Sequence, residues 1–136
     1  MARLQLRVYR DPGQAEVFVN VKRKDGGYDK RAAIVDTGAQ VSLLPSLLMN
    51  VLDFRASGDS RFTIEQAGIA SQAFEAIEAH VSMFLEDVDG NRTDEFEARV
   101  WFAETREVLL GFDGVLDYAV LHLDMPDLTG YLEFSD

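Results

Sequence analysis

The chain of 136 residues contains no cysteine and only two histidines, His80 and His122. The absence of cysteine excludes disulfide bonds, thiol catalysis and cysteine metal sites. Two histidines are too few for a histidine-rich metal site. Any chemistry must therefore come from carboxylates and hydroxyls, and we expect no metal ion and no cofactor.

Positive charge is also scarce, because 13 basic side chains stand against 24 acidic ones and the formal net charge is −11. Nucleic-acid binding needs Lys and Arg to replace counterions along the phosphates, so we expect no nucleic-acid partner. Two copies of so acidic a chain would have to associate through apolar or hydrogen-bonded surfaces. Salt would favour that association by screening their repulsion.

Long hydrophobic runs are missing as well. The longest apolar runs fall far short of the roughly 20 residues that cross a bilayer. The first seven residues alternate between apolar and polar, unlike the continuous apolar segment of a signal peptide. We therefore expect a cytoplasmic protein without a membrane partner. With 47% apolar residues, residues 1–136 are expected to form a single domain with a real core.

Alternating apolar and polar residues predict a mainly β fold. Asp25-Gly26-Gly27 and the segment 87–91 are typical of hairpin turns, and 55–60 is typical of a polar loop. One or two short helices are expected, after Pro45 and at 114–118. The C-terminal strand is expected to lie at a sheet edge or within one subunit. The predicted strands cover residues 3–9, 15–23, 28–35, 41–44, 62–64, 95–102, 108–111, 120–123 and 131–134.

Residues 72–85 fit two structures equally well. The spacing of Phe74, Ile77, Val81 and Phe84 is near that of a helix, and the many Ala and Glu residues favour one. The alternation of apolar residues from Ile77 to Leu85 fits a strand instead. Local propensity does not decide between them.

The most informative stretch is Asp36-Thr37-Gly38-Ala39, which follows the apolar strand that ends at Val35. Such a stretch can be a simple turn, or it can hold an ionisable carboxylate at the edge of a cleft. A second apolar strand, Leu109-Leu110, ends in Gly111 much later in the chain. The hydroxyl of Ser42, followed by Leu43-Leu44, adds a third element.

This combination resembles the retropepsin-like aspartic proteases, the single-lobed relatives of pepsin, from about residue 15 to 134. Asp36-Thr37-Gly38-Ala39 matches the family's Asp-Thr/Ser-Gly-Ala, and Leu109-Leu110-Gly111 matches the loop that backs the catalytic turn. The resemblance implies a closed β-barrel-like fold with a flap hairpin and a single helix after Gly111. It also implies an aspartic endopeptidase that acts on extended peptides.

The chain contains one Asp-Thr-Gly, and its length does not easily hold two such lobes. The resemblance then implies a homodimer in which each copy contributes one Asp36 and the two carboxylates activate a water. Thr37 would hydrogen-bond across the dimer. Gly38 and Ala39 would be small so that the backbone can approach the partner and the peptide. Retroviral members of the family join their chain ends in a sheet shared by the two subunits, so residues 131–134 are expected either to do the same or to form a strand within one subunit.

The resemblance places a substrate-binding flap at Gln66, Ala67, Gly68, Ile69 and Ala70, which favours the strand interpretation of 72–85. The tip has a single glycine where many relatives have more. Phe112 stands where retroviral members commonly carry Arg, so any ion pair made by that Arg must be replaced or absent. Asp113 and Asp117 are interpreted as favouring a helix dipole.

Two other interpretations remain open. A retropepsin fold that keeps Asp36 without proteolysis would be a binding or assembly module, and the flap and Phe112 motivate it. An unrelated β-sandwich with a chance Asp-Thr-Gly would require both motifs to be accidental.

Overall fold

The computed structural model describes residues 2–65 and 73–135, and these residues form a mainly β protein. Two 3-10 helices accompany the strands, η1 (Ser46–Asn50) and η2 (Leu116–Tyr118). The strands are β1 (Ala2–Gln5), β2 (Arg7–Tyr9), β3 (Gln14–Lys22), β4 (Tyr28–Val35), β5 (Ser42–Pro45), β6 (Phe54–Glu65), β7 (Ala73–Glu86), β8 (Phe96–Ala103), β9 (Val108–Leu110), β10 (Ala119–Asp124) and β11 (Thr129–Phe134).

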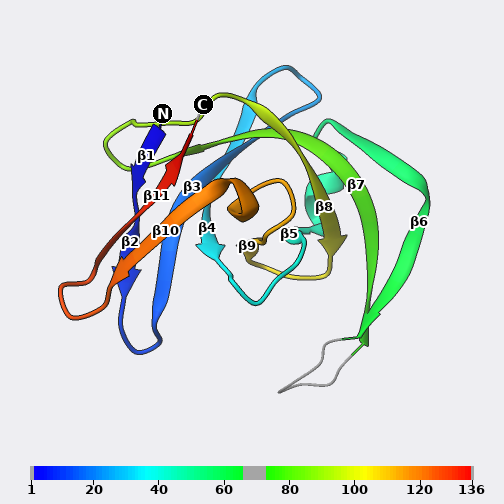
Figure 1. The fold of residues 1–136 in the computed structure, drawn as a ribbon. Helices are drawn as coiled ribbons and strands as arrows, with labels where there is room; N and C mark the ends of the chain where they lie inside the picture. The colour runs from blue at the N-terminus through cyan, green and yellow to red at the C-terminus, as the bar shows by residue number, and fades with distance from the viewer. Residues whose placement is uncertain (1, 66–72, 136) are drawn as a thin grey trace.

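Six strands close into a barrel in the order β3-β4-β9-β5-β8-β7 (Figure 1). The closure comes from β7, which pairs antiparallel with β3 between Phe18↔Glu86 and Val21↔Met83. Strands β2 and β6 continue the sheet beyond the barrel on either side. The expected closed β-barrel is therefore confirmed.

The barrel interior is filled by the apolar side of each alternating strand. In β8, Ala98, Val100 and Phe102 are buried, as the alternation predicts. Alternation along β3 predicts that Asn20 faces outward with Glu16 and Lys22. It is buried instead, and its side-chain amide donates to Glu86 Oε1 at 3.1 Å. That bond satisfies a polar group which would otherwise be costly to bury.

The predicted single strand at residues 3–9 is wrong, because the chain changes sheets at Leu6. Residues before it form β1, and residues after it form β2, which pairs with β3. The Leu6 amide donates to the Gly130 carbonyl at 2.9 Å. The small second sheet has the order β1-β11-β10, so the C-terminal strand β11 is central and not at an edge.

Residues 73–86 form the long strand β7, which confirms the strand interpretation over the helical one. Strand β7 pairs with β8 from Ala76↔Ala103 to Met83↔Phe96 and with β6 on its other side. These ladders override the helix propensity of its Ala and Glu residues. The predicted loop at 55–60 is wrong as well, since it lies within β6, where the register shifts between Ala56 and Arg61.

In the part of the chain that the structure describes, helical structure is limited to the two short 3-10 helices. Pro45 ends β5 and immediately precedes η1, as the sequence indicates. The helix expected after Gly111 is reduced to the three residues of η2. Within residues 2–65 and 73–135, the helices are too short for any of them to traverse a bilayer.

Candidate active site

The Asp36 stretch forms a loop across the end of another strand. Strand β4 leads into the loop at Asp36, and β5 takes up the chain again at Ser42. Strand β9 lies between these two strands, parallel to β4 and antiparallel to β5. Residues 36–41 therefore cross the carboxyl end of β9 at the lower end of the barrel in Figure 1.

Backbone hydrogen bonds join this loop to the segment that leaves β9. The Asp36 amide donates to the Leu110 carbonyl at 3.0 Å, and the Phe112 amide donates to the Ala39 carbonyl at 3.0 Å. The Asp113 amide donates to the Gln40 carbonyl at 2.8 Å. The structure thus brings together the two motifs that lie about 70 residues apart in the chain.

Gly111 lies at the point of closest approach. A Cβ on Gly111 would sit 2.8 Å from the Ala39 carbonyl oxygen and 2.9 Å from the Val41 carbonyl carbon. Both atoms belong to backbone that cannot move aside like a flexible side chain. The buried Gly111 amide donates to Ser42 Oγ at 2.9 Å, so the Ser42 hydroxyl completes the contact from β5.

The Asp36 carboxylate is half-buried at the start of this loop. Its Oδ1 accepts a hydrogen bond from the Gly38 amide at 2.9 Å, which is a local turn stabilised by the side chain. Thr37 and Gly38 are exposed, and Ala39 is half-buried. The loop therefore holds one ionisable group in a fixed place at the end of the barrel, beside backbone that a second molecule can approach.

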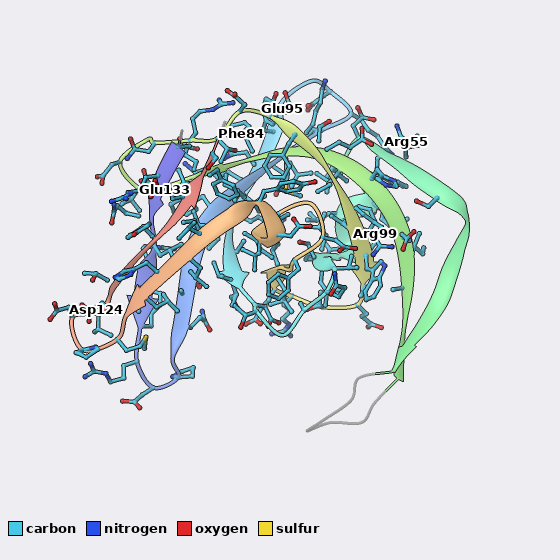
Figure 2. All side chains as sticks on the ribbon, in the orientation of Figure 1. Arg55, Phe84, Glu95, Arg99, Asp124 and Glu133 are labelled. Atoms are coloured by element: carbon cyan, nitrogen blue, oxygen red, sulfur yellow. The ribbon has the colours of Figure 1, made fainter. Side chains whose placement is uncertain are left out.

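A side-chain network outside the motif also reaches this loop. Gln40 donates to Asp113 Oδ1 at 2.6 Å, and Arg99 of β8 pairs with the other oxygen of Asp113. Arg99 also approaches Glu78 Oε1 of β7 at 3.4 Å, and the Trp101 indole donates to the same oxygen at 3.0 Å. Figure 2 labels Arg99 on the stretch of β8 that bears this network.

Of the two residues interpreted as favouring a helix dipole, Asp117 lies in the first turn of η2, whereas Asp113 lies before that helix. Asp113 instead ties the segment after Gly111 to the site loop and to β8. The network also places Arg99 next to Asp113, in the segment that follows Gly111. Phe112 occupies the position at which the resemblance implies an arginine. One sequence pattern points to this network, because alternation places Glu78 and Arg99 on the outward faces of their strands. Only the register of β7 against β8 shows that the two side chains are in contact.

The predicted flap residues Gln66 to Ala70 lie outside the described residues, as does the rest of 66–72. The strands that lead to them, β6 and β7, are paired up to Glu65↔Ala73. In Figure 1 these strand ends and the β4–β5 loop both lie at the lower end of the view. The strand part of the hairpin is confirmed, and a substrate-binding role for its tip stays a prediction.

A cavity of about 260 Å³ adjoins the site loop at Thr37. A larger cavity of about 410 Å³ is lined by residues that include Glu95, Gly114 and Tyr118 and none of residues 36–41. Figure 2 labels Glu95 at the upper end of the view. The smaller cavity is the one that borders the candidate site. Its lining residues are Gly13, Gln14, Ala15, Val35, Thr37, Leu121, Leu123 and Met125.

No group of three or more acidic, histidine or cysteine side chains among the described residues is placed to hold a metal ion. Comparisons of the chain with protein-family models, with curated proteins and with solved structures found no match. The candidate active site is therefore defined by the chain's own residues and their contacts.

Proposed function

We propose that the protein is a homodimeric aspartic endopeptidase of the retropepsin-like kind, with Asp36 of each copy in one shared active site. The observation that carries this proposal is that the backbone of Leu110 and Gly111 packs closely against the Asp36 loop and is hydrogen-bonded to it. If Asp-Thr-Gly occurred here by chance in an ordinary turn, no second apolar-apolar-Gly segment would be required to pack against its backbone.

One carboxylate is not enough for this chemistry, because peptide hydrolysis by water needs both a base and an acid. Two carboxylates held close together cannot both ionise cheaply, so the pair retains one proton. The two groups then titrate as a dyad, and neither apparent pKa belongs to one residue. A second copy of the chain supplies the missing carboxylate.

The reaction follows from that shared proton. The ionised Asp36 takes a proton from the water as the water oxygen bonds to the peptide carbonyl carbon, and the protonated Asp36 donates its proton to the carbonyl oxygen. The tetrahedral intermediate then collapses. The carboxyl group that took the proton of the water protonates the leaving nitrogen, the other carboxylate takes a proton from a hydroxyl of the intermediate, and the C–N bond breaks. The products are a carboxylic acid and an amine, and no covalent enzyme intermediate forms.

The neighbouring residues take supporting roles in the proposal. The exposed Thr37 hydroxyl would hydrogen-bond to the partner's loop. Gly38 and Ala39 have small or no side chains, so the backbones of the two copies and of the peptide could approach each other closely. The substrate would lie extended beneath the β6–β7 hairpin and bond to backbone as an added strand. The two protonation states required of the dyad predict cleavage that is strongest at acid to mildly acidic pH.

The test is cleavage of a peptide library, with products identified by mass spectrometry. We expect Asp36→Asn and Asp36→Ala to abolish cleavage while circular dichroism and the melting temperature stay near those of the wild type. Asp127→Asn, at an exposed position in the β10–β11 turn, is the matched control and should cleave as the wild type does.

Full cleavage by purified Asp36→Ala would contradict the proposal. A wild-type dimer that leaves every peptide intact while retaining some of them would favour the alternative, a binding or assembly module built on the same fold. A cleavage rate that rises steadily above neutral pH would contradict the shared-proton mechanism.

A further inference from the structure

The cavity of about 410 Å³ is separate from the Asp36 loop, since none of residues 36–41 lines it. Four parts of the chain form its wall: the start of β1, the segment that leads into β8, the stretch from Gly114 to Tyr118 and the end of β11. In Figure 1 the end of β11 and the segment that leads into β8 both lie at the upper end of the view. The volume is in the range of pockets that hold ligands.

Aromatic rings make up the apolar part of this wall. Phe96 comes from β8, Tyr118 from η2 and Phe134 from the last position of β11, so three separate elements each contribute one ring. Phe96 and Phe134 also pack against the hydrophobic core, whereas Tyr118 is 71% exposed. Packing of the fold therefore accounts for two of the rings and does not account for Tyr118.

The charged part of the wall is acidic. Asp94, Glu95 and Glu97 line the cavity, and the described residues of the wall include no Lys, Arg or His. Glu97 forms an ion pair with Arg55 at 2.6 Å, but Glu95 accepts its hydrogen bond from the uncharged Tyr28 hydroxyl, at 3.1 Å. The exposed Asp94 carboxylate has no hydrogen-bond or ion-pair partner within residues 2–65 and 73–135. Two negative charges beside the cavity are thus left without a cation.

The rings and the carboxylates together define a class of ligand. An anion would be repelled by the carboxylates and by a chain with a formal charge of −11. A wholly apolar molecule would displace water from the carboxylates without replacing its hydrogen bonds. A guanidinium group suits both parts of the wall, because its flat face stacks on aromatic rings and its N–H groups pair with carboxylate oxygens.

We propose that this cavity binds an arginine side chain of a polypeptide, with the guanidinium between the Tyr118 ring and the carboxylates of Asp94 and Glu95. These three residues are exposed, as is Ser135 at the end of β11, so the side chain can enter from solvent while its backbone stays outside. For the proposed peptidase, the arginine would hold a substrate at a point outside the Asp36 site. That consequence rests on the proposed function, whereas the binding itself does not.

An NMR titration of isotope-labelled protein with acetyl-Gly-Arg-Gly-amide tests the binding. The matched ligand carries citrulline, which has nearly the shape of arginine without its charge. We expect the arginine peptide to shift the amide signals of residues 93–97 and 114–118, and the citrulline peptide to bind at least roughly tenfold more weakly. Equal binding of the two peptides would overturn the proposal. Tighter binding of propylguanidinium than of the arginine peptide would overturn the assignment to a polypeptide.

A pair of double variants separates the cavity from the acidic surface as a whole. Asp94→Asn with Glu95→Gln removes the two carboxylates at the cavity, and Asp89→Asn with Asp127→Asn removes two exposed carboxylates elsewhere. We expect the first pair to raise the dissociation constant of the arginine peptide at least roughly fivefold and the second to change it by less than about twofold. Equal weakening in both would contradict binding in the cavity.

The aromatic part of the site has its own matched pair. Tyr118→Ala removes the exposed ring, and Tyr9→Ala removes a ring that is 42% exposed and does not line this cavity. We expect Tyr118→Ala to weaken binding of the arginine peptide about threefold or more and Tyr9→Ala to leave it unchanged. Unchanged binding in Tyr118→Ala would overturn the stacked arrangement.

The outcomes also separate this inference from the proposed function. Asp36→Asn should bind the arginine peptide as tightly as the wild type, and weaker binding would place the arginine at the Asp36 carboxylate and overturn the inference. A protein that cleaves peptides but binds no arginine in the cavity also overturns it and leaves the peptidase intact. A protein that binds the arginine peptide there and cleaves nothing supports the inference and contradicts the peptidase.

Discussion

At the scale of single residues, Gly111 controls how the Asp36 loop is held. Backbone atoms of Ala39 and Val41 lie within 3.0 Å of the place that a Cβ on Gly111 would occupy, and the Gly111 amide donates a hydrogen bond to the Ser42 hydroxyl. A side chain at this position would push the loop away from β9. The position of the Asp36 carboxylate then depends on a residue that has no functional group of its own.

We predict that Gly111→Ala lowers the free energy of unfolding by about 1–3 kcal/mol, because its Cβ would overlap backbone atoms of Ala39 and Val41. Urea denaturation measures the change. Peptide cleavage should fall further than the loss of folded protein explains, since the loop that positions Asp36 must shift.

Gly13→Ala is the matched control for stability. A Cβ at Gly13 meets only the Met125 methyl group at 3.7 Å, an ordinary contact distance. We expect this variant to unfold within about 0.5 kcal/mol of the wild type. Equal stability of Gly111→Ala and Gly13→Ala would contradict the close approach at Gly111.

The sequence predicts some of these residues and not others. Asp36 and Gly111 stand out because each ends an apolar strand in a recognisable pattern. Arg99 and Asp113 do not stand out, since their pairing depends on β8 lying beside the segment after β9. Contacts between segments that are distant in the chain leave no local pattern in the sequence. Arg99 and Asp113 therefore look like any other charged residues until the fold is known.

At the scale of elements, β7 illustrates how pairing decides structure. Its residues fit helix and strand equally by local pattern, but β8, β6 and β3 all pair with it in the folded protein. Backbone pairing with these neighbouring strands therefore selects the strand over the helix, a choice that local propensity alone does not make. The break at Leu6 has a similar cause, because the chain must leave one sheet for another at a point that alternation alone does not mark.

The turn between β7 and β8 depends on Asp87, whose side chain is buried. Burial by itself raises the pKa of Asp87, but four hydrogen bonds outweigh it and lower that pKa below the ordinary value of 3.8. The donors are the backbone amides of Gln5, Asp89 and Asn91 and the side-chain amide of Asn91. The carboxylate thereby fastens the turn to β1.

We predict that Asp87→Asn lowers the free energy of unfolding by about 2 kcal/mol at neutral pH, because the amide group cannot accept all of these bonds. A group with a lowered folded pKa stabilises the protein above its unfolded pKa, and this stabilisation is lost as the pH falls through the folded pKa. The difference between wild type and variant should therefore shrink below pH 3.8.

Chemical denaturation at several pH values measures this difference. Asp89→Asn, in the same turn but with an exposed side chain, is the control and should change stability by less than about 0.5 kcal/mol. A difference between wild type and Asp87→Asn that stays constant from neutral to acid pH would show that the carboxylate charge is not what stabilises the turn.

At the scale of the whole molecule, the barrel presents one Asp36 loop at its end, and β10 of the small sheet borders the cavity that reaches this loop at Thr37. Alternation and turn signals predict a mainly β chain from sequence, and the closed barrel is what the resemblance to the retropepsin-like proteases implies. The small sheet is not predicted, because it joins the first and last strands of the described chain. The proposed dimer places each copy's incomplete site next to the other's.

The most direct test of the shared active site is to mix wild-type protein with Asp36→Asn under conditions that allow the copies to exchange. Asn at position 36 cannot ionise, so a mixed dimer lacks the dyad. With total protein held constant, the account predicts that peptide cleavage falls as the square of the wild-type fraction. Cleavage that falls only in direct proportion to that fraction would show that one Asp36 is sufficient, and would contradict the account.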